Sequence, residues 1–196
     1  MNKPFSQSCE NNKQPILQRI ESIFHAPQTV WEIGSGTGQH ACHFAKNLPH
    51  IIWQTTDRAE NLMGINSWIT ETELPNLPTS LVLNVTDQEW PCQHIEALFT
   101  ANTLHIMHFH EVESFFNRLG RYLTNNTSVC IYGPFNYQGQ YTSPSNEQFD
   151  HWLKDRDPES GIRDFEMIES LANKAGLLLS DDFKMPANNR LLVFHS

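Results

Sequence analysis

Basic residues are scarce in this chain of 196 residues. It has 13 Lys and Arg against 22 Asp and Glu, which gives a formal net charge of -9. A negative balance opposes the phosphate contacts that carry nucleic-acid affinity. We therefore expect no nucleic-acid partner, and a small molecule is the better first candidate.

Cysteines and long apolar runs are also few. The four cysteines form no CxxC pair, which argues against a disulfide framework and a zinc knuckle. No apolar run approaches the roughly 18 residues of a membrane span, and no signal-peptide pattern is present near the start. We expect a soluble, cytoplasmic protein with no membrane partner, and the sequence leaves its oligomeric state open.

Apolar stretches typical of strands alternate with stretches whose apolar residues have helical spacing. This alternation predicts an α/β fold with a mostly parallel sheet and helices on both faces. The last two strands have no helix between them, so they are expected to form an antiparallel C-terminal hairpin. The seven expected strands are TVWEIG, IIWQTT, SLVLNV, IEALFTAN, SVCIYG, LLLSDDF and RLLVFH.

The chain fits a single domain, residues 1–196, with an N-terminal lid and helix segment at 1–28 and the sheet core at 29–196. Residues 134–146 are rich in turn formers and are expected to be an active-site loop. Helices are predicted at about 13–25, 38–48, 61–72 and 111–123. Another is predicted to begin near Ser145, which forms a capping box with Gln148, and the last at 162–175 with Gly176 at its end.

The segment VWEIGSGTGQH places Gly34, Gly36 and Gly38 between an expected strand and an expected helix. Such a turn brings backbone N–H groups and the positive helix end close to a ligand. The dinucleotide fingerprint GxGxxG needs a third glycine where Gln39 stands, which disfavours NAD. Glu32, at the end of the strand, favours a ligand with an amine or a positive charge.

Asp57 closes the second expected strand, 21 residues after Gly36. An acidic residue at this spacing typically accepts hydrogen bonds from ribose hydroxyls. The ligand is therefore expected to carry a ribose together with a cationic group.

With these residues, the chain resembles the class I S-adenosylmethionine-dependent methyltransferase superfamily. The resemblance implies the Rossmann-like methyltransferase fold and S-adenosylmethionine as the cofactor. It also implies that Asp57 holds the ribose, while Asn84 and Val85 lie at the adenine edge. The turn residues that it places under the methionine part are Glu32, Gly34, Ser35, Gly36 and Gly38.

Further stretches are similar to a narrower methyltransferase-like family and span nearly the whole chain. One departure is Asn84, where that family is expected to have an aspartate, although an amide can still form a hydrogen bond with adenine. The stretches are FSQSCENNKQPIL, WQTTD, ANTLHIMHF, YGPFN, SNEQFDHWL, GIRDFE and MPANN.

Two residues are candidates for removing a proton from the methyl acceptor. His105 follows the fourth strand at the sheet edge where ligands bind in such folds, and Lys13 heads the first expected helix, where a cation is unfavourable. The spacing of His105, His108 and His110 also raises a zinc hypothesis. No carboxylate or cysteine is fixed at ligand spacing by the sequence, so we expect no metal site.

Several polar and aromatic residues are candidates for contacts with the cofactor or the acceptor. Asn102, just after the fourth strand, is expected to contact the cofactor, although an Asn there can simply close a turn. The candidates for substrate binding are Asn12, Tyr132, Phe135, Asn136 and Asn188.

Together these features predict an enzyme that transfers a methyl group from S-adenosylmethionine to a small molecule. A module that binds this cofactor without catalysis, such as a regulatory subunit, shares the glycine turn and is the main alternative. An NAD-dependent oxidoreductase is disfavoured by Gln39 and Glu32.

Overall fold

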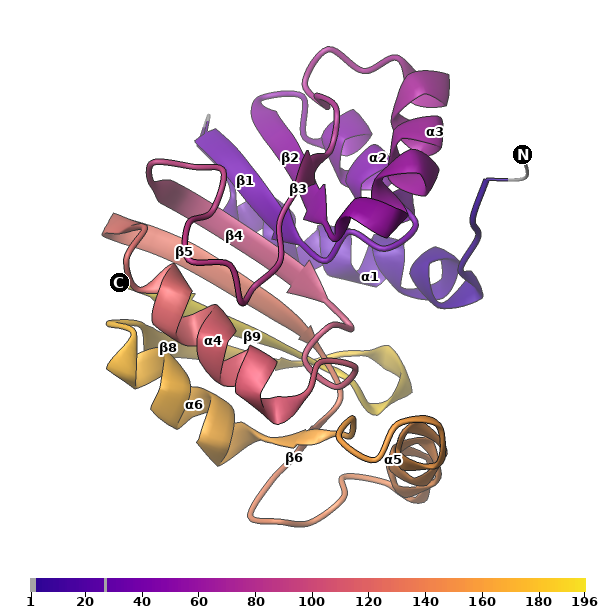
Figure 1. Ribbon diagram of the computed structural model, residues 1–196, viewed down its shortest axis with the longest axis vertical. Coiled ribbons are helices and arrows are strands. Elements are labelled where there is room, and N and C mark those ends of the chain that lie inside the picture. The colour runs from indigo at the N-terminus through magenta and orange to yellow at the C-terminus, as the bar shows by residue number, and fades with distance from the viewer. Residues whose placement is uncertain (1–2, 27) are drawn as a thin grey trace.

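The computed structural model describes residues 3–26 and 28–196 and has a seven-stranded sheet at its centre (Figure 1). The strand order is β3-β2-β1-β4-β5-β9-β8. Strands β3 to β5 pair in parallel, while β9 is antiparallel to both of its neighbours, as the sequence predicted. The strands are β1 (Gln28–Ile33), β2 (Ile51–Asp57), β3 (Leu81–Val82), β4 (Ile95–Ala101), β5 (Leu123–Gly133), β8 (Leu178–Lys184) and β9 (Arg190–His195).

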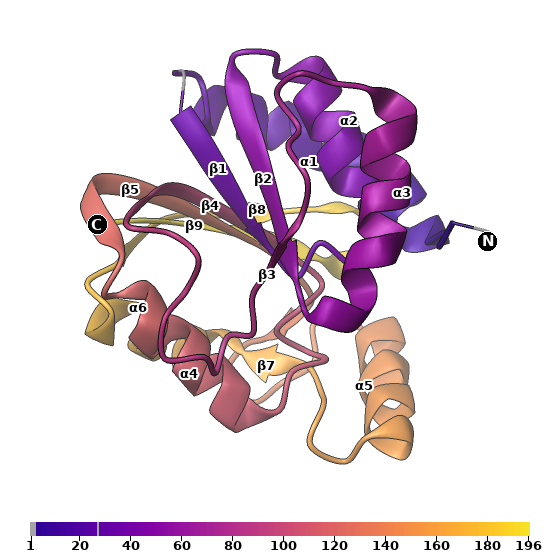
Figure 2. The ribbon, with the colours of Figure 1, turned by 45° about the horizontal axis from the view of Figure 1, so that its top comes forward.

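Helices cover both faces of the sheet and bury two apolar cores. One face packs against α1 (Gln7–Ile23), α2 (Gln39–Asn47) and α3 (Leu62–Thr72), and α3 directly follows the short helix η1 (Ala59–Asn61). The other face packs against α4 (Phe109–Leu119) and α6 (Phe165–Lys174). Figure 2 shows α5 (Pro144–Arg156) standing away from the sheet. The architecture is therefore the predicted Rossmann-like α/β fold.

The first helix begins earlier than the sequence predicted. Ser6 accepts a hydrogen bond from the backbone N–H of Cys9, so α1 begins at Gln7 rather than near residue 13. A serine side chain that satisfies an otherwise unpaired N–H at the start of a helix is a typical N-cap. Lys13 consequently lies within the helix and not at its head. The predicted lid segment 1–28 includes residues 1, 2 and 27, which lie outside the described residues.

One short strand interrupts the segment 134–146 that was expected to be a loop, and a second replaces the expected start of the helix at 162. Strand β6 (Phe135–Asn136) pairs in parallel with β7 (Arg163–Asp164), and this two-stranded sheet anchors the chain on both sides of α5. Because 163–164 is extended, α6 begins at Phe165 and not at Ile162. Ser143, rather than Ser145, caps α5 through a bond from the Asn146 N–H.

The order of the strands determines where a ligand can bind. The chain moves outward from β1 to β2 and β3, then returns to β4 on the other side of β1. In open α/β sheets, the crevice at the carboxyl ends of the strands beside such a reversal is the usual ligand site. None of the helices in residues 3–26 and 28–196 is long and apolar enough to cross a membrane.

Candidate functional site

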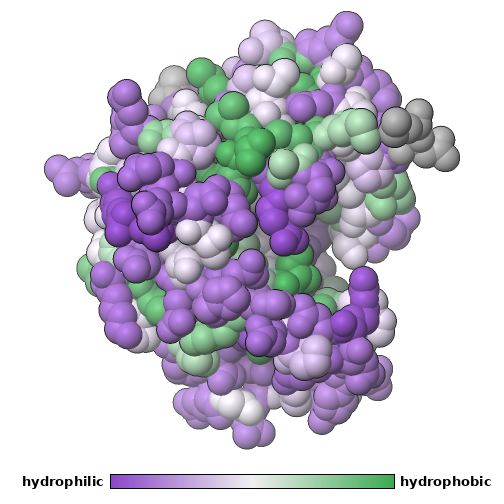
Figure 3. Space-filling model, viewed as in Figure 1, coloured by the Kyte–Doolittle hydropathy of each residue, from purple (hydrophilic) through white to green (hydrophobic). Residues whose placement is uncertain are grey.

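A cavity of about 690 Å³ opens at the carboxyl ends of β1, β2, β4 and β5. Figure 3 shows the surface hollowed on the right, between the upper elements and α5. The residues that we proposed from the sequence and that line this cavity are Asn12, Gly34, Ser35, Gly36, Asp57, Asn84, Val85, Asn102, His105 and Tyr132. The fold thus brings most of the candidate residues together.

The three glycines of the turn are not all needed for the same physical reason. A Cβ on Gly34 would lie 2.5 Å from the Thr103 side chain, and one on Gly38 would lie 3.2 Å from the Ile65 backbone. These two glycines are required for packing. A Cβ on Gly36 would meet no atom within 4 Å, although Gly36 lines the cavity. Gly36 is therefore the position where a missing side chain leaves room for a ligand.

The backbone donors of this turn are largely used within the protein. The N–H groups of Gly34 and Ser35 donate to the carbonyl of Thr56, and that of Gly38 donates to the carbonyl of Ser35. The Gly36 N–H donates to the carboxylate of Asp57 at 2.7 Å. A pyrophosphate needs several free backbone donors, so this turn suits a ligand without phosphates better.

Asp57 is the best-organised charged group of the cavity. Besides Gly36, it accepts hydrogen bonds from the Arg58 N–H and the Asn61 amide, both at 2.7 Å, and its side chain is buried. Three donors fix the orientation of the carboxylate without using all of its acceptor sites, because each ionised carboxylate offers about four. The remaining sites can accept hydrogen bonds from the hydroxyls of a ligand.

Glu32 lies beneath the turn and not on the cavity wall. Its carboxylate is buried and accepts a hydrogen bond from the Trp53 indole at 3.2 Å. Burial raises the pKa of Glu32 to about 7, because desolvation disfavours the charged form. The expected role of Glu32 toward a ligand amine therefore stays a prediction. Because Glu32 does not line the cavity, it would have to act on that amine through the residues of the turn.

His40, which the sequence reasoning did not select, joins a polar network at the cavity. Its Nε2 lies 2.6 Å from Oδ1 of Asn12, and its ring stacks on Phe44. Burial lowers the pKa of His40 to about 4, so the ring is neutral at neutral pH. Burial likewise raises the pKa of Tyr132, against the lowering effect of hydrogen bonds with Asn12 and Asn189. The network links α1, α2, β5 and the turn before β9.

His105 lies inside the cavity, 6% exposed, with its ring edge-to-face against Phe149. Burial, helped by the charge of Arg163, lowers the pKa of His105 to about 4. Within residues 3–26 and 28–196, no hydrogen bond involves its imidazole, and only burial and the charge of Arg163 act on it. A neutral ring without an internal partner is available to a bound molecule.

The loop that carries His105 is held from the other side of the cavity. The backbone carbonyl of His105 accepts a bond from the Gly161 N–H at 2.8 Å. The guanidinium of Arg163 donates to the carbonyls of Leu104, Met107 and Glu159. These bonds connect the segment after β4 to the segment between α5 and β7, and so they determine the position of His105.

Asn84, Val85 and Asn102 also line the cavity, Asn84 and Val85 after β3 and Asn102 after β4. The side-chain oxygen of Asn84 accepts bonds from the backbone N–H and the hydroxyl of Thr86, at 3.1 and 2.9 Å. Asn102 has a left-handed backbone with φ of 59°. It therefore also closes the turn after β4, in addition to facing the cavity.

Other predicted site residues do not line the cavity. Lys13 pairs with Glu10, and Phe135 is buried in the core against α4 and α6. Asn136 is buried within β6, and the carbonyl of Asn188 accepts a bond from the Asn146 amide. Gly38 packs on α3. Their roles toward a ligand stay predictions, and the geometry gives those predictions no support.

Further lining residues come from two segments that the sequence analysis marked only by their similarity to a family. The start of α1 and the N-terminal part of α5 both reach the cavity. In the sequence, only the family-like stretches FSQSCENN and SNEQF pointed to these two segments. These residues are Ser6, Ser8, Cys9, Asn11, Ser145, Asn146 and Phe149.

Solved structures on which the chain superposes include an S-adenosylmethionine-dependent methyltransferase and an O-methyltransferase family protein. The chain superposes on the methyltransferase SibL in its apo form (TM-score 0.80, 16% identity, 96% of this chain and 55% of that chain). It also superposes on an O-methyltransferase family 2 protein from Planctomyces limnophilus in complex with apigenin (TM-score 0.80, 13% identity, 96% and 60%). A third match is PigF with SAH (TM-score 0.82, 10% identity, 97% and 56%).

These similarities show that the chain has the fold of the S-adenosylmethionine-dependent methyltransferases. The chain spans little more than half the length of the proteins it matches. Its own family is given by a separate comparison, in which residues 3–196 match the family described as "Protein of unknown function (DUF938)". The protein therefore belongs to the DUF938 family and has a methyltransferase fold.

Proposed function

We propose that this protein is an S-adenosylmethionine-dependent methyltransferase that acts on a small molecule. The observation that carries the proposal is the open space at Gly36 beside the fixed carboxylate of Asp57. Both lie at the reversal in strand order, where ligands bind in sheets of this kind. The fold shared with methyltransferases supports the same conclusion, although fold alone does not fix a reaction.

On the cofactor side, Asp57 would hold the ribose hydroxyls, and Gly36 would lie against the methionine part. Asn84 and Val85 would border the adenine, and Asn102 would contact another part of the cofactor, since all three line the cavity. When bound, S-adenosylmethionine supplies an electrophilic methyl group on a positively charged sulfur. Because the backbone N–H groups of the turn donate within the protein, few are left for the pyrophosphate of NAD, which supports S-adenosylmethionine as the ligand.

On the acceptor side, His105 is the residue whose position best supports a role in proton transfer. Its pKa of about 4 keeps the ring neutral, so a nitrogen lone pair can accept a hydrogen bond or a proton from the acceptor. Phe149 and Met107, which also line this end, provide apolar contacts that exclude water. Alignment of the acceptor with the methyl group would contribute most to the rate, up to roughly 7–11 kcal/mol.

Calorimetric titration with S-adenosylmethionine, S-adenosylhomocysteine and NAD tests the cofactor assignment. We expect saturable binding of the first two compounds and none of NAD. Transfer of a labelled methyl group to a protein-free extract of cellular small molecules then tests catalysis. Binding of NAD alone would overturn the proposal, and binding of S-adenosylmethionine without any transfer would favour the non-catalytic module.

A further inference from the structure

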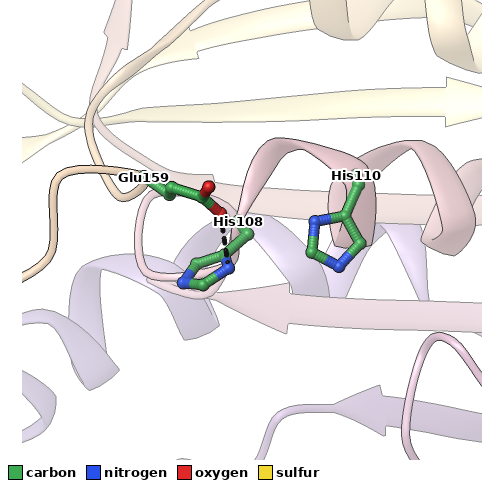
Figure 4. A group of neighbouring side chains, drawn as sticks. All are labelled: His108, His110 and Glu159. Carbon is green, nitrogen blue, oxygen red and sulfur yellow. Dashed lines mark ion pairs between the residues drawn. The ribbon is translucent and has the colours of Figure 1, made fainter.

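The histidines that are close in sequence separate in the folded chain. His105 turns into the cavity, whereas His108 and His110 lie at the start of α4, near the surface. There they meet Glu159, which the chain brings from the segment after α5 (Figure 4). The carboxylate that the sequence could not place beside these histidines is therefore supplied by a residue about 50 positions away.

We propose that His108, His110 and Glu159 form a binding site for a divalent transition-metal ion such as Zn²⁺, with Asp157 orienting His108. This site is separate from the cavity and does not depend on the proposed methyltransferase activity.

The ligand types and their spacing fit such an ion. One ligand atom from each of the three residues lies within 4.8 Å of the others, and imidazole nitrogen with carboxylate oxygen suits Zn²⁺. Ligands about 2 Å from one Zn²⁺ lie roughly 3.3 Å apart. The ligand atoms that are farthest apart therefore need to approach by at most about 1.5 Å, while the 2.7 Å pair of His108 Nδ1 and Glu159 Oε2 opens slightly. His110 and Glu159 are exposed, and rotation of their side chains can provide this movement.

The contacts of His108 resemble those of a histidine ligand with its supporting carboxylate. Its Nε2 lies 2.8 Å from Oδ2 of Asp157, and its Nδ1 lies 2.7 Å from Oε2 of Glu159. A histidine ligand commonly donates its second ring N–H to a carboxylate, which fixes the tautomer and makes the other nitrogen a better ligand. Asp157 can play this part while Nδ1 binds the ion in place of a proton.

The local charge also favours a cation. Carboxylates of Glu111, Asp157 and Glu159 surround His108, and Glu111 accepts a bond from the His108 backbone N–H. The nearby guanidinium of Arg163 is directed to backbone carbonyls, including that of Glu159. Three acids therefore offset the unfavourable effect of the α4 N-terminus on a cation.

Such an ion would join two segments that border the cavity. His108 directly follows the segment that carries His105, and Glu159 precedes Gly161, whose N–H holds the His105 carbonyl. Arg163 already connects these two segments through the carbonyls of Met107 and Glu159. We therefore expect the bound ion to add to the stability of the folded chain.

The test is calorimetric titration of chelator-treated protein with Zn²⁺. We expect one saturable site per chain, an affinity at least tenfold lower in His110→Ala, and a 10- to 100-fold loss in Asp157→Asn. His151→Ala is the matched control, because His151 is also an exposed histidine on a helix. That variant should bind Zn²⁺ like the natural protein.

Thermal unfolding gives a readout that does not depend on activity. Zn²⁺ should raise the unfolding temperature of the natural protein and of His151→Ala, but not of His110→Ala. His110 takes no part in the ion pairs of His108, so its loss leaves those pairs intact. Equal Zn²⁺ affinity in His110→Ala and the natural protein, or no saturable binding at all, would overturn the proposal.

Discussion

The backbone N–H of Gly36 donates a 2.7 Å hydrogen bond to the carboxylate of Asp57, which couples the glycine turn of β1 to the end of β2. One residue leaves space and the other supplies charge, and the bond between them fixes their relative position. A cofactor with a sugar and a methionine part can use both at once. The first two predictions follow from this pair.

A side chain at Gly36 should block the cofactor while the fold persists. We expect Gly36→Val to abolish binding of S-adenosylmethionine, because the added atoms occupy cavity space, with a stability cost of roughly 1–2 kcal/mol from the left-handed backbone. Titration and thermal unfolding measure the two effects. Gly34→Ala is the comparison, and it should mainly lose stability through the clash with Thr103. Unaltered affinity in a folded Gly36→Val protein would contradict the cofactor assignment.

Removing the charge of Asp57 should weaken the cofactor. Asp57→Asn keeps the shape of the side chain but loses charged hydrogen bonds, so we expect a loss of about 1.5–3 kcal/mol in the binding of S-adenosylhomocysteine. Titration calorimetry provides the measurement. Asp181→Asn, which changes an exposed acid on β8 that does not line the cavity, serves as the control. If both variants bind S-adenosylhomocysteine equally tightly, Asp57 does not hold the ribose.

His105 and Lys13 were both predicted as bases, and kinetics can separate them. With the acceptor identified, His105→Ala should slow turnover by roughly 100- to 10,000-fold and keep cofactor affinity. Lys13→Ala should change little, because Lys13 is paired with Glu10 and does not line the cavity. Equal losses of turnover and cofactor affinity in His105→Ala would indicate a structural histidine.

The pH dependence of turnover gives a second test of His105. Since the pKa of His105 is about 4, turnover should fall only when the pH drops well below 6.5, the ordinary pKa of a histidine.

Glu32 should make the protein less stable as the pH rises. Its pKa is about 7 in the folded state against 4.5 in the unfolded state, so the folded chain holds the extra proton. The stabilisation is complete below pH 4.5 and is lost as the pH rises through about 7. Glu32→Gln should therefore be more stable than the natural protein at pH 8, by up to about 3 kcal/mol, with the difference vanishing near pH 4. Denaturant unfolding of the ligand-free protein at both pH values is the measurement, and a constant difference would refute this explanation.

The order of strands and helices could be predicted because it depends on local apolar patterns. Seven strands and the antiparallel pair β8 and β9 follow from runs such as IIWQTT and RLLVFH, whose period and length are properties of short segments. The positions of Gly36 and Asp57 could be predicted for a similar reason. In parallel sheets, residues at the ends of successive strands meet at one edge.

Some boundaries and contacts depended on residues far apart in the chain. The pairing of β6 with β7 turned a polar stretch into strand, because Phe135 and Arg163 meet only in the folded chain. The same is true of Glu159 beside His108, and of the Asn12 contact with His40. Periodicity contains no information about such partners.

The sequence by itself thus determined the α/β order, the glycine turn and the acid at the end of the second strand. Only the tertiary structure decided that Glu32 lies beneath the turn, that Lys13 pairs with Glu10 and does not line the cavity, and that His105 enters it. The physical reason is that burial and side-chain direction depend on which elements pack together, and this packing is a property of the whole chain.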